Sequence, residues 1–115
     1  MNLEQSRNQY RAALDQALIE VTSFLSAKPE VERIVLFGSY GAGRRDLFTD
    51  LDLLVVMSSD LDFVSRTAQV YSQIAVGVDL DLLIYTPEEF EEQRLKGFVR
   101  KILETGRVLY EKKRA

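Results

Sequence analysis

The order of apolar patterns along the chain predicts a single α+β domain, in which a sheet and helices form two layers (α/β two-layer). Residues 3–27 place apolar side chains at helical spacing with polar residues between them, which is typical of a long amphipathic helix. Three short apolar runs follow at 33–37, 50–57 and 78–85, and they predict buried strands. The chain has 115 residues, 46% of them hydrophobic, which fits one domain with its own core.

The remaining elements follow from local start and stop signals. Pro29 ends the first helix, because proline disfavours helical conformation in the residue before it. Helical spacing returns over 60–75, where the apolar positions are Leu61, Val64, Ala68, Tyr71 and Ile74. A capping box with proline in the first turn then starts another helix: Thr86, Pro87 and Glu89. We expect that helix to run to about residue 92, a further helix from near Phe98 to Gly106, and a short last strand over 107–110.

Composition excludes several kinds of chemistry. The chain has no cysteine and no histidine, which excludes disulfide scaffolds, thiol nucleophiles, imidazole metal ligands and Ser-His-Asp catalysis. Any acid–base or metal chemistry must therefore use carboxylates, hydroxyls, lysine or arginine. The net charge of −3 and the pI of about 5.0 argue against general nucleic-acid binding.

The charge is unevenly distributed, and no segment predicts membrane insertion. Residues 94–115 hold eight basic and two acidic residues, which favours a solvated basic face and leaves an acidic partner or a phosphate as alternatives. The first residues carry acids and amides, and no apolar stretch approaches about 18 residues. We therefore expect a cytoplasmic protein that does not engage a membrane.

Two pairs of aspartates stand within or beside the second and third predicted strands. Side chains alternate across a strand, so Asp50 and Asp52 share one face, and so do Asp79 and Asp81. One such pair is readily explained by an exposed sheet face. Two pairs on strands about 4.8 Å apart bring like charges together, which favours a bound cation. Oxygen ligands without histidine or cysteine suit Mg²⁺ or Mn²⁺.

A glycine-rich loop follows the first predicted strand. It begins Gly38-Ser39-Tyr40 and continues through Arg44 and Arg45. Glycine permits close backbone approach, and the amides at a following helix start can hold phosphate. The loop is neither a Walker loop nor a dinucleotide fingerprint, because it lacks Gly-Lys-Ser/Thr and the third glycine.

Together these features resemble the nucleotidyltransferases of the DNA polymerase β superfamily. The most diagnostic part is a strand ending in Gly38-Ser39, ten intervening residues, and then Asp50-Leu51-Asp52 in an apolar strand. The closer resemblance is to the minimal nucleotidyltransferases often paired with a HEPN-domain protein. It rests on four segments: residues 36–39, 49–55, 85–90 and 102–110.

This resemblance implies the fold and the domain boundaries. It implies a nucleotidyltransferase-like mixed sheet with helices packed on one side. We expect a single minimal domain over 1–115, with an N-terminal helix within 1–28 and a catalytic core over 30–111.

The resemblance also implies an activity and its residues. It implies transfer of a nucleoside monophosphate from an NTP, with ATP expected, to a hydroxyl of a protein or small-molecule acceptor, assisted by two Mg²⁺ or Mn²⁺ ions. Asp50 and Asp52 would hold the ions together with a third carboxylate. That carboxylate is Asp79 or Asp81, and Asp81 is preferred because its spacing to Tyr85-Thr86-Pro87 matches the family. The Gly38 backbone and Ser39 would hold the triphosphate.

The loop departs from the family at one position. Many relatives have arginine where this chain has Ala42, so Arg44 or Arg45 would have to grip the triphosphate instead. Tyr40 is a candidate nucleotide contact, with plain loop packing as the alternative. The other aromatic residues are expected in the core: Phe37, Phe48, Phe63, Tyr71, Phe90, Phe98 and Tyr110.

The expected partner is a second subunit. Larger relatives close over the nucleotide with an additional domain, so a copy of this chain or a HEPN-domain protein would complete the site. The resemblance implies an antitoxin that acts on a HEPN-type toxin, by modifying it or otherwise. The alternative is a catalytically inert module that binds a nucleotide or partner and neutralises that partner by contact alone.

Overall fold

The computed structural model describes residues 2–44 and 49–113, and it confirms the α+β class. The elements are α1 (Leu3–Ser26), β1 (Val31–Phe37), α2 (Gly38–Gly41), β2 (Leu51–Met57), α3 (Phe63–Ser72), β3 (Leu80–Tyr85), α4 (Pro87–Gln93), α5 (Gly97–Thr105) and β4 (Arg107–Glu111). The long first helix, the four strands and the two C-terminal helices lie close to their predicted positions. The short helix α2, within the predicted loop, was not expected.

The four strands form one mixed sheet in the order β3-β2-β1-β4. β1 runs antiparallel to both β2 and β4, whereas β2 and β3 are parallel. A parallel pair needs a crossover connection, and α3 supplies it between β2 and β3. The start of β2 therefore lies beside the end of β1 and the start of β3, at one end of the sheet.

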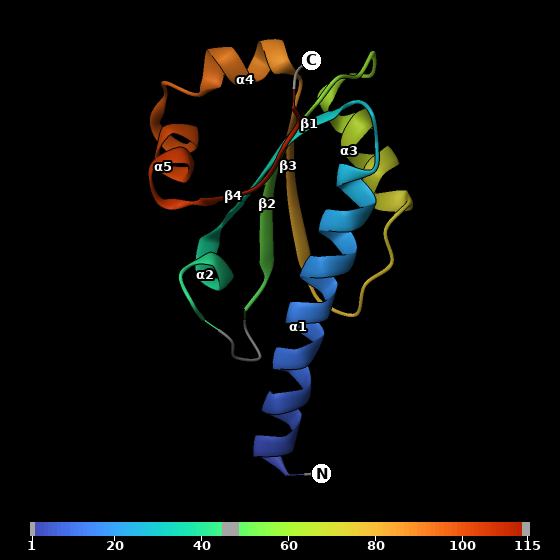
Figure 1. Ribbon diagram of the computed structural model, residues 1–115, viewed down its shortest axis with the longest axis vertical. Helices are drawn as coiled ribbons and strands as arrows, with labels where there is room; N and C mark the ends of the chain where they lie inside the picture. The colour runs from blue at the N-terminus through green and yellow to red at the C-terminus, as the bar shows by residue number, and fades with distance from the viewer. Residues whose placement is uncertain (1, 45–48, 114–115) are drawn as a thin grey trace.

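One face of the sheet is covered by α1 and α3 (Figure 1). α1 contributes a stripe of buried residues, Leu14, Ala17, Val21 and Leu25. These side chains pack on the inward positions of the strands, among them Leu36, Leu53 and Ile84. At about 25 cal/mol per Å² of buried apolar surface, each such side chain contributes on the order of 2 kcal/mol to burial.

The opposite face is covered by α4 and α5, so the expectation of helices on one side is corrected (Figure 1). Phe90 of α4 and Val99 and Ile102 of α5 pack on Val35 and on the buried residues Leu54 and Val56. The physical reason lies in the central strands. β2 is apolar at six of its seven positions, and a strand without polar alternation needs cover on both faces.

The buried face of α3 also differs from the prediction. Val64 is 76% exposed, whereas Arg66 and Val70 are buried. Asp62 caps the helix by accepting a hydrogen bond from the Ser65 amide, so the helix begins at Phe63. Its buried face is formed by Arg66 and Val70, which stand four residues apart.

The buried Arg66 guanidinium joins α3 to the end of β3 and to α4. It donates to the Ile84 carbonyl at 3.0 Å and to both carboxylate oxygens of Glu89, at 2.6 and 3.0 Å. Every partner is an oxygen acceptor, which is how a guanidinium is retained inside a core.

Within the described ranges, no helix has both the length and the apolar character that crossing a bilayer requires.

Candidate active site

Asp52 and Asp81 lie side by side on the sheet face that also carries α4 and α5. They are register partners in the parallel pairing of β2 with β3. Their neighbours Leu51, Leu53 and Leu82 point to the α1 face, so alternation directs both carboxyls to the other face. Asp50 directly precedes β2 and is half-buried, whereas Asp79 directly precedes β3 and is exposed.

The environment of Asp52 is strongly acidic. Partial burial, the charge of Asp81, a side-chain hydrogen bond with Asp81 and the charge of Asp50 together raise the pKa of Asp52 to about 6. Burial has the largest effect, and the effects of the neighbouring carboxyls follow. A cation bound beside Asp52 would stabilise the ionised carboxylate, because it offsets the like charges of Asp50 and Asp81.

The donor set fits a hard divalent cation. Asp50, Asp52 and Asp81 offer only carboxylate oxygens, which Mg²⁺ and Mn²⁺ prefer. Among residues 2–44 and 49–113, no three acidic side chains already stand together as a complete ligand group.

Gly38 connects the end of β1 to this carboxyl pair. Its φ of +76° lies in the left-handed region that favours glycine. A Cβ at this position would lie 2.9 Å from the Asp52 Cγ atom and nearer still to Oδ2, which is far inside contact distance. Glycine is therefore required twice here, by the backbone conformation and by the approach of Asp52.

The other predicted phosphate-binding residues follow Gly38. Ser39 lies half-buried in α2, and its carbonyl accepts a hydrogen bond from the Arg44 amide at 2.9 Å. Arg44 is exposed just after α2. Arg45 lies outside the described residues. Ala42 is the C-cap of α2.

α1 holds both ends of the loop that separates Gly38 from Asp50. The Tyr10 hydroxyl donates to the Thr49 carbonyl at 2.9 Å, just before Asp50. The Tyr40 hydroxyl donates to Asp15 Oδ1 at 2.5 Å, and the Tyr40 ring is 4% exposed. The structure therefore supports the packing alternative for Tyr40 and does not direct its ring toward a nucleotide.

Tyr71 of α3 fixes the backbone on either side of Asp81. Its hydroxyl donates to the Leu80 carbonyl at 3.0 Å and accepts from the Leu82 amide at 2.7 Å. β3 is an edge strand, so these backbone groups have no neighbouring strand to pair with. The Asp79 carbonyl instead accepts from the Leu51 amide at 3.0 Å, so Asp79 marks the point where pairing with β2 begins.

The expectation that Phe98 belongs to the core is wrong. Its ring is 64% exposed and meets Phe37 edge to face, with ring centres 6.0 Å apart. Phe63 and Tyr71 are also exposed, whereas Phe90 is buried as expected and Phe48 lies outside the described residues. Helical spacing gives no signal for this exposure, because Phe98 stands four residues before the buried Ile102 on the same side of α5.

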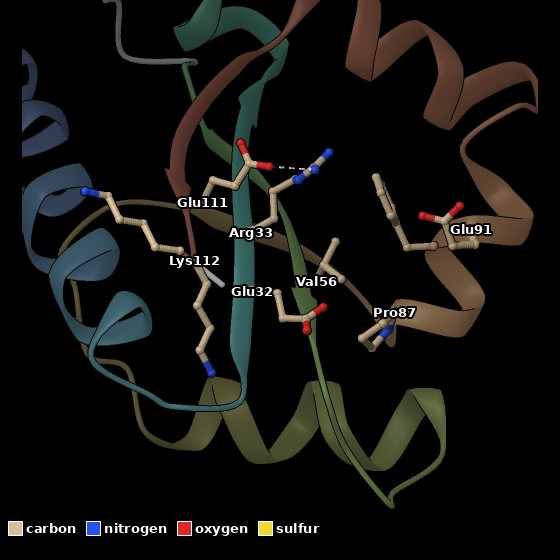
Figure 2. A pocket seen from close by; sticks show the side chains of 9 residues that line it. Glu32, Arg33, Val56, Pro87, Glu91, Glu111 and Lys112 are labelled. Carbon is tan, nitrogen blue, oxygen red and sulfur yellow. Dashed lines mark hydrogen bonds and ion pairs between the residues drawn. The ribbon is translucent and has the colours of Figure 1, made fainter. Parts of the chain in front are cut away.

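A pocket of about 670 Å³ lies at the opposite end of the same sheet face. Arg33 and Val56 line it, at the start of β1 and the end of β2, whereas Phe37 and Asp52 occupy the other ends of these strands. Figure 2 shows the Arg33 guanidinium directed at Glu111, 3.0 Å away. This pocket is separate from the aspartates.

The fold and the site define the class of the protein. The mixed sheet aligns the Asp52 and Asp81 carboxyls beside Gly38, at the start of α2, in a chain that has neither histidine nor cysteine. Comparison with known families agrees, since the family "Polymerase beta, Nucleotidyltransferase" matches residues 20–115. The chain belongs to this family.

Individual relatives are similar over most of their length. A protein of Methanocaldococcus jannaschii named "Putative protein adenylyltransferase" is 32% identical over 98 residues, covering 84% of this chain and 97% of the relative. A solved structure from Sulfolobus solfataricus, described as a "putative nucleotidyltransferase", has a TM-score of 0.55 at 17% identity and covers 94% of this chain and 86% of that one.

Two further solved structures come from toxin–antitoxin complexes. A tyrosine-to-alanine mutant of the toxin–antitoxin MntA–HpeT contains a chain with TM-score 0.53 at 22% identity, covering 85% of this chain and 72% of that one. A toxin–antitoxin structure with AMP-PNP gives a TM-score of 0.52 at 22% identity, with 84% and 73% covered. At these identities the likeness establishes a shared fold.

Proposed function

We propose that this chain transfers the AMP group of ATP to a hydroxyl of a protein acceptor, and that Mg²⁺ is required. The observation that carries the proposal is the alignment of Asp52 with Asp81 beside Gly38, on one face of the sheet. The family supports nucleotidyl transfer, the M. jannaschii relative's name supports a protein acceptor, and the neighbour with AMP-PNP supports an adenine nucleotide. A small-molecule acceptor and another NTP are the alternatives.

Each residue has a distinct role in this proposal. The Gly38 backbone and Ser39 hold the triphosphate, and Arg44 or Arg45 adds positive charge. Asp50, Asp52 and Asp81 would hold two Mg²⁺ ions, which neutralise the phosphates and stabilise both the attacking and the leaving oxygen. The acceptor oxygen forms a bond to the α-phosphorus, the bond to the β-phosphate oxygen breaks, and pyrophosphate leaves. Asp81, the exposed member of the carboxyl pair, accepts the proton of the acceptor hydroxyl.

The proposed partner is a HEPN-domain toxin in the cytoplasm, with this chain as its antitoxin. The likeness to chains from toxin–antitoxin complexes supports this role. An open site also supports a partner, because Gly38 and Asp81 are both exposed in the described chain. A second copy of this chain is the alternative.

The experiment is transfer of label from ATP labelled at the α-phosphate into macromolecules of a host extract with Mg²⁺. The extract supplies both the acceptor and any subunit that completes the site. The matched control is the double variant Asp50→Asn/Asp52→Asn, which keeps side-chain size and removes charge. We expect a labelled protein band with the wild type and at least a roughly 100-fold weaker band with the variant, as for removal of a main electrostatic contributor.

The result also separates the enzyme from the inert binding module. If no label is transferred while a partner still co-purifies with both forms, the contact alternative replaces the enzyme. If the double variant labels as strongly as the wild type, the site assignment is wrong.

A further inference from the structure

Three residues stand in a row across the end of the sheet. Phe37 is the register partner of Asp52, and Asp52 is the register partner of Asp81. Directly opposite residues on neighbouring strands point to the same face, so the Phe37 ring flanks the carboxyl pair on its β1 side. Phe98 continues the row beyond Phe37, edge to face at 6.0 Å with an interplanar angle of 85°.

The packing of α5 leaves the Phe98 ring open to solvent. Val99 and Ile102 of the same helix are each 3% exposed and carry its packing on the sheet, whereas Phe98 is 64% exposed. The edge-to-face contact with Phe37 orients the Phe98 ring, and most of the residue's surface stays open to solvent. An ordered aromatic ring with a free face beside a polar site is a surface on which another flat ring can stack.

The two sides of the carboxyl pair have different partners in the proposed reaction. Asp81 stands on the edge strand β3 and faces the acceptor hydroxyl. Gly38 and Ser39, which hold the triphosphate, follow directly from Phe37 at the end of β1. The nucleotide therefore lies toward β1, and among the described residues 2–44 and 49–113 Phe37 and Phe98 are aromatic residues that border it there.

We infer that Phe98 is the residue on which the nucleobase stacks, with Phe37 holding its ring in position. This inference rests on the proposed function, because it requires a nucleotide at the aspartates. It assigns the recognition of the base to the first turn of α5, separately from the recognition of the phosphates at Gly38 and Ser39.

The test compares the binding of ATP with that of inorganic tripolyphosphate, both with Mg²⁺, by calorimetry on the whole chain. Tripolyphosphate has the phosphates and lacks the base. We expect Phe98→Ala to weaken ATP binding by at least about fivefold, the low end for loss of one base–aromatic stack. Binding of tripolyphosphate should be unchanged. Leu95→Ala is the matched control, because Leu95 is an apolar residue that is 77% exposed and stands three residues before Phe98 in the sequence, and this variant should bind ATP as the wild type does.

A tryptophan variant adds a second readout and preserves stacking. The chain has no tryptophan, so Phe98→Trp introduces a single tryptophan at the proposed platform, which can be excited selectively over the five tyrosines. We expect ATP to change its emission and tripolyphosphate to leave it unchanged, whereas a Leu95→Trp reporter should respond to neither.

The outcomes separate the inference from the function beneath it. If the wild type binds ATP and Phe98→Ala binds it equally well, base stacking on Phe98 is wrong and the proposed function stands. If Phe98→Ala weakens tripolyphosphate as much as ATP, the ring acts on the phosphates or on the fold, and the inference is again overturned. If the wild type binds neither ligand, the inference is overturned for this chain, and label transfer in host extract, which supplies any completing subunit, decides the proposed function separately.

Discussion

Asp79 and Asp81 are two residues apart in the sequence, but their surroundings differ. Asp81 is paired in register with Asp52 and its charge helps to raise the pKa of Asp52, and Tyr71 fixes the backbone on either side of Asp81. Asp79 precedes the strand and contributes its carbonyl to the start of the sheet. These contacts support Asp81 as the third carboxylate of the proposed site.

This difference gives a prediction for two matched variants. Asp81→Asn should reduce label transfer by at least about 100-fold, because it removes a charge that holds the metal ions and the group that takes the proton. Asp79→Asn should stay within a few-fold of the wild type, because the Asp79 backbone contact is retained. Initial rates with labelled ATP measure both, and the reverse order of effects would assign the role to Asp79.

Gly38 and Gly43 both have positive φ but differ in their surroundings. A Cβ at Gly38 would strike Asp52, whereas a Cβ at Gly43, with φ +99°, meets nothing within 4 Å. Gly43→Ala should therefore lower the free energy of unfolding by only about 1–2 kcal/mol, the cost of holding a residue with a Cβ in the left-handed conformation. Gly38→Ala should lower the free energy of unfolding by more than this, and it should also abolish label transfer, because Asp52 must move.

Urea unfolding and label transfer on the two variants give the measurement. Equal stability and equal activity of Gly38→Ala and Gly43→Ala would show that Asp52 does not approach Gly38 as described.

At the scale of elements, the Arg66–Glu89 contact joins α3, β3 and α4. The hydrogen bonds from Arg66 hold the pKa of the Glu89 carboxyl below its usual value, and the Thr86 amide acts in the same direction. Because the pKa of Glu89 is lowered in the folded state, the stabilisation that the Arg66–Glu89 contact provides is fully present above about pH 4.5. It is lost as the pH falls below that value.

Glu89→Gln tests this contact, because glutamine keeps the capping-box hydrogen bond with Thr86 and removes the charge. We expect the variant to be less stable at pH 7 by about 1 kcal/mol, a small value because the carboxylate is 39% exposed. This difference should shrink as the pH falls below about 4.5 and through the lowered pKa of Glu89, because the glutamate then becomes neutral like the glutamine.

Urea unfolding at several pH values measures the difference. Glu91→Gln is the control, since its surface pair with Arg94 should contribute little at any pH. A Glu89→Gln difference that stayed constant across the pH range would contradict an ionic contribution.

The elements were predicted well where local signals dominate. The box at Thr86 and the proline at 87 gave the start of α4, and the apolar runs gave β1, β2 and β3. The face of α3 was not predicted, because the buried residue is an arginine whose partners lie up to 23 residues away in the sequence. The helices on both faces could have been expected from the continuous apolar character of β2.

At the scale of the molecule, the sequence located the proposed site through a linear motif. Gly38, Asp50 and Asp52 are close in the sequence, and their approach follows from one antiparallel pairing. Phe98 was missed because its place beside Phe37 depends on how α5 packs on β1, about 60 residues along the chain from Phe37. Tertiary packing decides which aromatic residues face the site.

The central claim is that the chain transfers a nucleotidyl group and not a phosphoryl group. The most direct measurement follows label into the acceptor from two forms of ATP, one labelled at the α-phosphate and one at the γ-phosphate. We predict transfer from the α-phosphate alone, with pyrophosphate released, and loss of transfer in Asp50→Asn/Asp52→Asn. Label arriving from the γ-phosphate, or α-label that persists in the double variant, would contradict the mechanism.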